Sequence, residues 1–311
     1  MLQKIAYLGW PNCYRLTNER IELIVTADVG PRIIYLGSPA GENLFAVLPE
    51  QAGLIGGDEW RLYGGHRLWH APQARPRTEL PDNAPIQVVS EGPTLRLVPP
   101  AETAANVQKE IAIRLVNEQP HVEVRHILRN IGLWPIELAP WAISAMNVNG
   151  IAIAPHSQTP TPHQVLPNRV FALWPFSDGQ DPRLHWGTHY TMLRQDPTDQ
   201  RPFKIGLNVT DGWAAYHRGE QLLVKCFACD SKAVYPDFGS TVELFVCGAF
   251  LELETLGPLV RLQPGEATGH REYWFLFDQV KEPANEEEVE RTIRPLAEQA
   301  MSQTPFSRGT A

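Results

Sequence analysis

The feature that most constrains this chain is the recurrence of short segments in which apolar and polar residues alternate. Alternation with a period of two places one side-chain face in a core and the other in solvent, as in a half-buried β-strand. Turn sequences such as Asn149-Gly150 separate the segments. No helical pattern alternates with them, so we expect an all-β fold, a large antiparallel β-sandwich. The segments lie at residues 21–26, 32–36, 86–89, 94–98, 111–116, 122–128, 136–138, 203–207, 222–227, 242–246, 251–254 and 273–277.

Helical structure is expected only near the C-terminus. The 311 residues include 23 glycines and 28 prolines, and both residue types disfavour helix interiors. Asn285 is a suitable N-cap, residues 286–288 are acids that suit the first turn of a helix, and an apolar stripe follows over 289–300. We therefore expect one sandwich domain over residues 1–301, including a short C-terminal helix, and a flexible tail over residues 302–311.

Charge and composition exclude several classes of partner. The chain has 27 basic and 35 acidic residues, a formal net charge of -8, and no basic run, so we expect no nucleic-acid partner. No apolar stretch approaches the roughly 18 residues of a membrane-spanning helix. The N-terminus lacks the basic and apolar regions of a signal peptide, and four cysteines do not make a disulfide framework in a chain of this length. We therefore expect no membrane partner and a cytoplasmic location.

The segment 63–72, which begins Tyr-Gly-Gly, is the first candidate site. On a strand, His66 and His70 share one face and Arg67 and Trp69 share the other. The segment thus offers a titrating group, a cation and an aromatic ring for a site. A purely structural role, with a glycine turn, packed rings and hydrogen-bonded histidines, accounts for the same sequence. Two histidines can also begin a metal site, but no third ligand follows at a suitable spacing. We therefore predict no metal and no cofactor.

The segment 250–258 is the second candidate, because Glu252 and Glu254 lie on one face of its predicted strand. Neighbouring carboxylates repel, so one of them can hold a raised pKa and transfer a proton. A strand with one solvent-exposed face and no catalytic role would have the same sequence pattern.

Tryptophans give a third indication, because flat rings can cover the apolar faces of a sugar. Trp69 and Trp141 are the candidates for stacking, and core packing is the alternative explanation. His189, close in sequence to Asp181 and Arg183, is a further candidate for a polar cleft. The tryptophans in loop-like contexts are Trp60, Trp69, Trp141, Trp174, Trp186 and Trp213.

The order of these segments resembles the galactose mutarotase-like superfamily, and most closely an uncharacterised bacterial domain family within it. Residues 64–72 resemble that family's early Gly-Gly motif, and residues 121–130 resemble its mid-chain strand, which ends in an Asn-containing turn. Residues 253–258, 262–266 and 272–274 resemble the C-terminal segment that carries the catalytic glutamate of mutarotases. The resemblance spans nearly the whole chain and implies a supersandwich with a carbohydrate cleft on its concave face.

The resemblance also implies a mechanism. In mutarotases a glutamate takes the proton of the anomeric hydroxyl while a histidine donates one to the ring oxygen. By position, Glu254 matches the glutamate. The segment that should carry the histidine reads Ala139-Pro-Trp-Ala-Ile-Ser144 here and contains none. Unless His66, His70 or a loop histidine supplies the acid, the mutarotase mechanism lacks half of its catalytic pair.

The resulting hypothesis is a carbohydrate-binding, aldose 1-epimerase-like isomerase that acts on a small-molecule sugar or oligosaccharide by general acid/base catalysis. Two alternatives stay open: a non-catalytic carbohydrate-binding module, which the missing histidine favours, and a lyase or hydrolase of an acidic glycan, which the histidines and arginine favour. The expected catalytic residues are Glu254, His66 and His70, and the expected substrate-binding residues are Arg67, Trp69, Trp141, Glu252 and His189.

Overall fold

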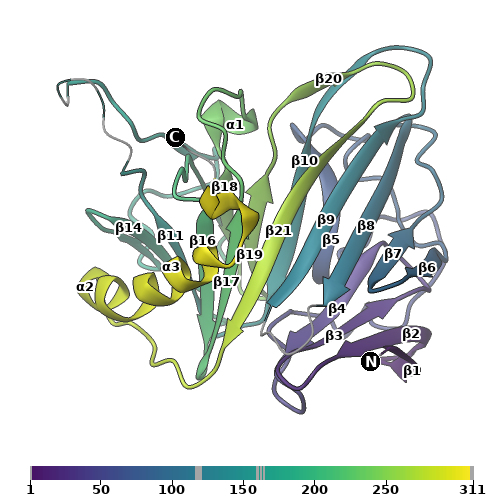
Figure 1. Cartoon of the computed structure of the whole chain (residues 1–311), viewed down its shortest axis with the longest axis horizontal. Coiled ribbons are helices and arrows are strands. Elements are labelled where there is room, and N and C mark those ends of the chain that lie inside the picture. The colour runs from purple at the N-terminus through teal and green to yellow at the C-terminus, as the bar shows by residue number, and fades with distance from the viewer. Residues whose placement is uncertain (1, 116–120, 159–160, 162, 164, 309–311) are drawn as a thin grey trace.

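Two large antiparallel sheets dominate the computed structural model, which describes residues 2–115, 121–158, 161, 163 and 165–308 (Figure 1). The all-β prediction is confirmed. Within the described residues the first sheet has 11 strands. Their order is β1 (Leu2–Tyr7), β2 (Trp10–Thr17), β3 (Glu22–Thr26), β4 (Arg32–Gly37), β5 (Gly65–Ala71), β10 (Ile136–Met146), β19 (Leu251–Leu256), β18 (Val242–Val246), β15 (Phe203–Leu207) and β12 (Phe171–Leu173), with β20 (Val260–Leu262) paired to β10.

The second sheet has ten strands in the same described ranges. Their order is β13 (Leu184–Trp186), β14 (Tyr190–Arg194), β11 (Ile151–Pro155), β16 (Trp213–Arg218), β17 (Gln221–Phe227), β21 (Ala267–Phe277), β9 (His121–Asn130), β8 (Val107–Leu115), β7 (Thr94–Val98) and β6 (Gln87–Glu91). The main hydrophobic core lies between the sheets. Leu68 and Leu253 of the first sheet belong to it, as do Val124 and Leu276 of the second. The period-two pattern therefore sorts side chains between this interface and the outer faces.

The C-terminal helices cover the outer face of the second sheet. They comprise α2 (Glu286–Glu288), a π-helical turn (Val289–Ile293) and α3 (Arg294–Ser302), and the side chain of Asn285 caps the first of them as expected. Ile293, Ala297 and Ala300 are buried in a second core with residues of β16 and β17, and Figure 1 shows α3 in front of these strands. Within the part of the chain that the structure describes, no helix is long and apolar enough to cross a membrane.

Two shorter elements complete the described chain. A turn labelled α1 (Pro236–Gly239) precedes β18, and a 3₁₀ helix spans Pro305–Arg308. The expectation of a flexible tail from residue 302 differs from this arrangement, because Thr304 is buried and Phe306 packs edge-on against Tyr273. Residues 309–311 of that predicted tail lie outside the described residues.

The Gly64-Gly65 pair lets β5 begin where its backbone passes close to the backbone of neighbouring segments. Both residues have left-handed backbones, with φ of 99° and 71°. A Cβ on Gly64 would lie 2.1 Å from the carbonyl oxygen of Ala46, and one on Gly65 would lie 2.3 Å from that of Ile33. Only glycine fits both the angle and the space. The motif therefore positions the strand that carries the first candidate residues.

Candidate functional site

Strand β5 divides the first candidate motif between two faces of its sheet. His66 pairs in register with Ser144 and contacts His126 of the second sheet, so it lies in the interface between the sheets. His70, four residues along the same strand, is also buried. Arg67 and Trp69 alternate with them and lie on the outer face, as the period of a strand predicts.

The outer face of the first sheet holds a cluster built around Lys204. Its Nζ lies 2.7 Å from Glu243 Oε2 and 3.0 Å from Glu254 Oε2. The register places Glu243 directly opposite Glu254 on the neighbouring strand. Trp141 Nε1 donates to Glu254 Oε2 at 2.6 Å, and Lys204 Nζ sits 4.6 Å and 4.7 Å from the ring centroids of Trp141 and Trp174. We call these five residues the outer-face cluster.

Burial favours the protonated form of both carboxyls in the outer-face cluster. Burial raises the pKa of Glu243 well above its usual value, in spite of the attraction of Lys204. Burial also raises the pKa of Glu254, but Trp141 and Lys204 both donate to that carboxylate, which favours its charged form. Of the two carboxyls, Glu243 is thus the one whose surroundings more strongly favour the neutral form.

A second ion pair lies beside the cluster on the same face. Arg67 Nη2 donates to Glu252 Oε1 at 2.9 Å, and the guanidinium lies over the ring of Trp69 at 4.7 Å. Trp69 in turn contacts Trp141 edge-on, with centroids 5.6 Å apart. Counting only the described residues, Arg67 Nε and Nη1 and the Oε1 atoms of Glu243 and Glu254 have no hydrogen-bond partner. These buried groups have capacity for a polar ligand.

A hollow of about 350 Å³ opens above the outer-face cluster. Trp141, Trp174, Gln73, Arg75 and Asp237 line it. Its volume lies near the lower end of the range for small-molecule sites, about 300–1,000 Å³. A larger hollow of about 630 Å³ lies between the end of β21 and α3, but no tryptophan among the described residues lines it.

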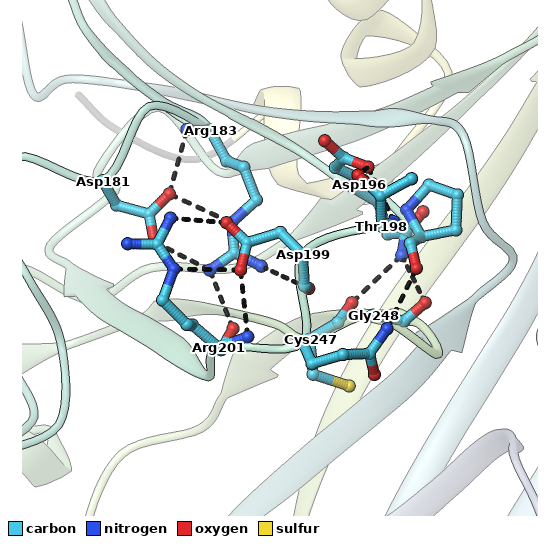
Figure 2. A network of polar contacts seen from close by, with 11 residues as sticks. Asp181, Arg183, Asp196, Thr198, Asp199, Arg201, Cys247 and Gly248 are labelled. Carbon is cyan, nitrogen blue, oxygen red and sulfur yellow. Dashed lines mark hydrogen bonds and ion pairs between the residues drawn. The ribbon is translucent and has the colours of Figure 1, made fainter.

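His189 lies away from this face, on the turn between β13 and β14. It is exposed, and its backbone N–H donates to Glu286 Oε2 at 2.9 Å. The polar cleft expected beside it is instead a closed ion-pair network, shown in Figure 2. Arg183 Nη2 donates to Asp181 Oδ2 at 2.7 Å and to the carbonyl of Arg201 at 2.8 Å. Asp181 and Arg183 are both buried, so they fix the loop before β15 rather than face a ligand.

The structure thus brings together Arg67, Trp69, Trp141, Glu252 and Glu254, and it separates His66, His70 and His189 from them. Sequence reasoning missed Glu243 and Lys204, which complete the cluster. Glu243 interrupts an otherwise apolar predicted strand, and that isolated charge was the available signal. The contacts of Glu243 with Glu254 and Lys204 could not be predicted, because they depend on the pairing of β18 with β19 and β15.

Among the described residues, one group of three side chains has the geometry to bind a metal ion. It consists of His66, His126 and Glu272, which are all buried between the sheets and not on the outer face. His70, the other histidine of the first candidate motif, does not belong to this group, and the two further side chains come from the distant strands β9 and β21.

Comparisons with known proteins give the fold. No protein-family model matches this chain, and no curated protein matches it. The solved structure of the Slr1438 protein from Synechocystis sp. PCC 6803 is similar, with TM-score 0.57 and 12% identity, covering 89% of this chain and 99% of that one. A candidate aldose 1-epimerase from Escherichia coli K12 has TM-score 0.54 and 14% identity, over 86% and 99% of the two chains. A galactose mutarotase-like protein from Lactobacillus casei has TM-score 0.51 and 10% identity, over 86% and 100%. The chain has the galactose mutarotase-like fold.

Proposed function

We propose that this protein binds a sugar over the outer-face cluster and interconverts its anomers, as an aldose 1-epimerase does. The observation that carries the proposal is the pair of buried carboxyls at Glu243 and Glu254, which share Lys204 beneath a tryptophan-lined hollow. With the proton on Glu243 and the charge on Glu254, the pair can donate one proton and accept another.

The proposed reaction uses both states of the pair. The sugar ring lies against Trp141 and Trp174, whose faces cover its C–H groups. Glu254 takes the proton of the anomeric hydroxyl while Glu243 donates its proton to the ring oxygen, and the C1–O5 bond breaks to give the open aldehyde. Rotation about the C1–C2 bond presents the other face of the aldehyde. The same proton transfers run in reverse and close the ring as the other anomer.

The histidine acid of the initial hypothesis is replaced in this proposal by Glu243. His66 and His70 lie on the opposite face of the sheet, and a proton on either would have to cross the backbone layer to reach Glu254. Arg67 and Glu252 lie on the correct face, and we assign them to the binding of sugar hydroxyls. The location of the protein and its organisation as one domain stay predictions.

Binding without turnover is the second candidate, and one observation favours it. Glu243 and Glu254 are both 0% exposed, and Trp141 covers Glu254 directly. Catalysis therefore requires that the indole of Trp141 shift far enough for the sugar packed against it to reach the carboxyls, whereas binding in the hollow does not. Arg67, Trp141 and Trp174 would serve either function.

Anomeric exchange of a panel of aldoses, followed by NMR, tests the proposal. We expect the wild-type protein to accelerate exchange for at least one sugar, and we expect E254Q and E243Q each to slow that exchange about 100-fold or more, the usual size of a lost acid or base. E137Q is the matched control, because Glu137 is an exposed carboxyl on β10. Quenching of tryptophan fluorescence without acceleration would establish the binding module. Neither signal with any sugar would refute both functions.

A further inference from the structure

Three ligand atoms from three strands converge in the interface between the two sheets. His66 Nε2 of β5 lies 2.7 Å from His126 Nε2 of β9. Glu272 Oε2 of β21 lies 4.0 Å from the first of these nitrogens and 3.8 Å from the second. All three side chains are 0% exposed. His66 belongs to the first sheet and the other two to the second, so the group joins the layers.

The separations suit a small divalent ion. Three atoms with these separations lie on a circle with a radius of about 2.1 Å, which matches the bonds of zinc to imidazole nitrogen and carboxylate oxygen, about 2.0–2.2 Å. The two nitrogens are closer together than tetrahedral ligands, so a small opening between His66 and His126 would accompany binding. Two imidazoles and one carboxylate favour zinc over calcium or magnesium.

The second layer of contacts holds each ligand in the orientation that binding requires. His126 Nδ1 lies 3.2 Å from the carbonyl oxygen of His270, which can only accept, so this nitrogen carries the proton and Nε2 keeps its lone pair. His66 Nδ1 lies 2.8 Å from Ser144 Oγ, a group that can donate or accept. Binding would move the His66 proton from Nε2 to Nδ1, where Ser144 accepts it, with no net loss of a proton.

Glu272 can bind both a lysine and an ion because its two oxygens face different partners. Lys225 Nζ lies 3.1 Å from Oε1, and Thr255 Oγ1 donates to the same oxygen at 2.7 Å. Oε2 faces the imidazoles and, counting donors in the described ranges, accepts a hydrogen bond only from Trp274 Nε1, at 2.8 Å. A carboxylate oxygen has a second lone pair, which is free for a metal.

We propose that His66, His126 and Glu272 form a structural zinc site that fastens the first sheet to the second. The site is independent of the sugar site, from which the backbone of β5 separates it. Its burial among Phe45 and Trp274 leaves no route for a substrate, so the ion would act on stability and not on a reaction. The competing arrangement holds a proton between the two Nε2 atoms instead of the ion.

Refolding with defined metal content tests the site. The full-length protein is unfolded in urea, refolded with one equivalent of Zn²⁺ or with EDTA, and dialysed against metal-free buffer. Bound metal is then measured by mass spectrometry and Tm by circular dichroism. We expect one zinc per chain and a Tm several degrees higher for the zinc-refolded protein, since a ligand that binds only the folded state stabilises it. H66Q and H126Q should bind no zinc and show no such difference.

A matched control variant and a second measurement distinguish loss of the zinc site from a general loss of folding. H217Q removes another fully buried histidine, whose Nε2 contacts the carbonyl of Val280 at 2.7 Å, and should keep both the zinc and the Tm difference. Should H66Q and H126Q fail to fold, Co²⁺ refolding of the wild type decides, because bound Co²⁺ gives visible absorption bands of low-coordinate geometry. Folded wild-type protein with no bound metal, or zinc retained by both H66Q and H126Q, would overturn the site.

Discussion

Two buried lysines, one in each polar cluster, differ in the number of carboxyls that they face. Lys225 in the sheet interface lies 3.1 Å from Glu272 and also donates to the carbonyl of Leu253. Lys204 on the outer face lies between Glu243 and Glu254. Burial dominates at Lys225 and lowers its pKa, although Glu272 opposes it. At Lys204 burial acts in the same direction, but two carboxyls outweigh it and raise the pKa.

This difference separates a cluster with a structural role from a cluster suited to a polar substrate. In the interface, one lysine faces one carboxylate, to which Thr255 and Trp274 also donate. On the outer face, the second carboxyl has no second cation, and burial favours its protonated form. Buried carboxyl oxygens that lack hydrogen-bond partners among the described residues lower the stability of a sheet. The same oxygens, beside a carboxyl with a raised pKa, are useful where a polar ligand binds.

The largest effect should come from removal of the interface lysine. K225M leaves Glu272 charged, buried and without its cation, and the loss of one partner of a buried ion pair costs about 3–5 kcal/mol. K204M should cost less, because Glu243 is already neutral and Glu254 can take a proton. Urea unfolding at pH 7 in EDTA measures both changes.

The double variant K225M/E272L is the control for this prediction. Removal of both charges leaves no unpaired ion, so we expect it to regain most of the stability lost in K225M. If K204M destabilises the protein as much as K225M does, the two lysines do not differ in the way that the raised pKa of Lys204 and the lowered pKa of Lys225 indicate.

The second-largest effect should be a loss of folding stability at acid pH that arises from His70. This residue is 1% exposed, its Nδ1 has no partner in the described ranges, and burial, with Lys109 and Arg77 nearby, lowers its pKa to about 3. The unfolded chain takes up the proton below about pH 6.5, whereas the native state does not. Stability from this residue is therefore lost as the pH falls from 6.5 towards 3, by about 1.4 kcal/mol per pH unit.

H70L removes that dependence and isolates it. The difference in unfolding free energy between wild type and H70L, measured from pH 7 to pH 4.5, should fall with decreasing pH. H185L changes an exposed histidine and should leave the slope of the wild type unchanged. Equal slopes for wild type and H70L would show that His70 is accessible to protons in the native state.

The alternation of β5 and β19 was enough to predict which side chains share a face. It placed Arg67 with Trp69, opposite His66 and His70, and it placed Glu252 with Glu254. The same alternation predicted the sandwich. These properties are local, since one strand's backbone fixes the direction of its own side chains.

Contacts between strands distant in sequence could not be predicted in this way. His66 meets His126 and Glu272 across the sheet interface, and Lys204 meets Glu243 through the pairing of β15 with β18. Each contact depends on strand order and on the packing of two sheets. The alternation of one strand therefore could not show that His66 and His70 lie on the sheet face opposite to Glu254, although it did place Glu252 and Glu254 on one face.

The third effect concerns the hydrogen bond that covers Glu254. W141F keeps a ring over Lys204 but removes the Nε1–H donor that lies 2.6 Å from the carboxylate. A hydrogen bond to a charged group contributes about 1.5–3 kcal/mol, so we expect a loss of about 2 kcal/mol in urea unfolding at pH 7. W186F, at a ring that is 48% exposed, should change stability by less than about 0.5 kcal/mol. A similar loss in both variants would mean that the Trp141–Glu254 bond is weak in solution.

An effect with the opposite sign to that of His70 should come from Glu243. Burial holds the pKa of this carboxyl well above its usual value, so between about pH 4.5 and the raised pKa the native state keeps a proton that the unfolded chain has released. Stability from Glu243 is therefore full below about pH 4.5 and is lost as the pH rises, by at most about 1.4 kcal/mol per pH unit. E243Q has no proton to lose. The stability difference between wild type and E243Q, measured from pH 5 to pH 8, should therefore decline with increasing pH. A constant difference would mean that Glu243 is charged beside Lys204, and the outer-face cluster would then lack the proton that the proposed reaction donates.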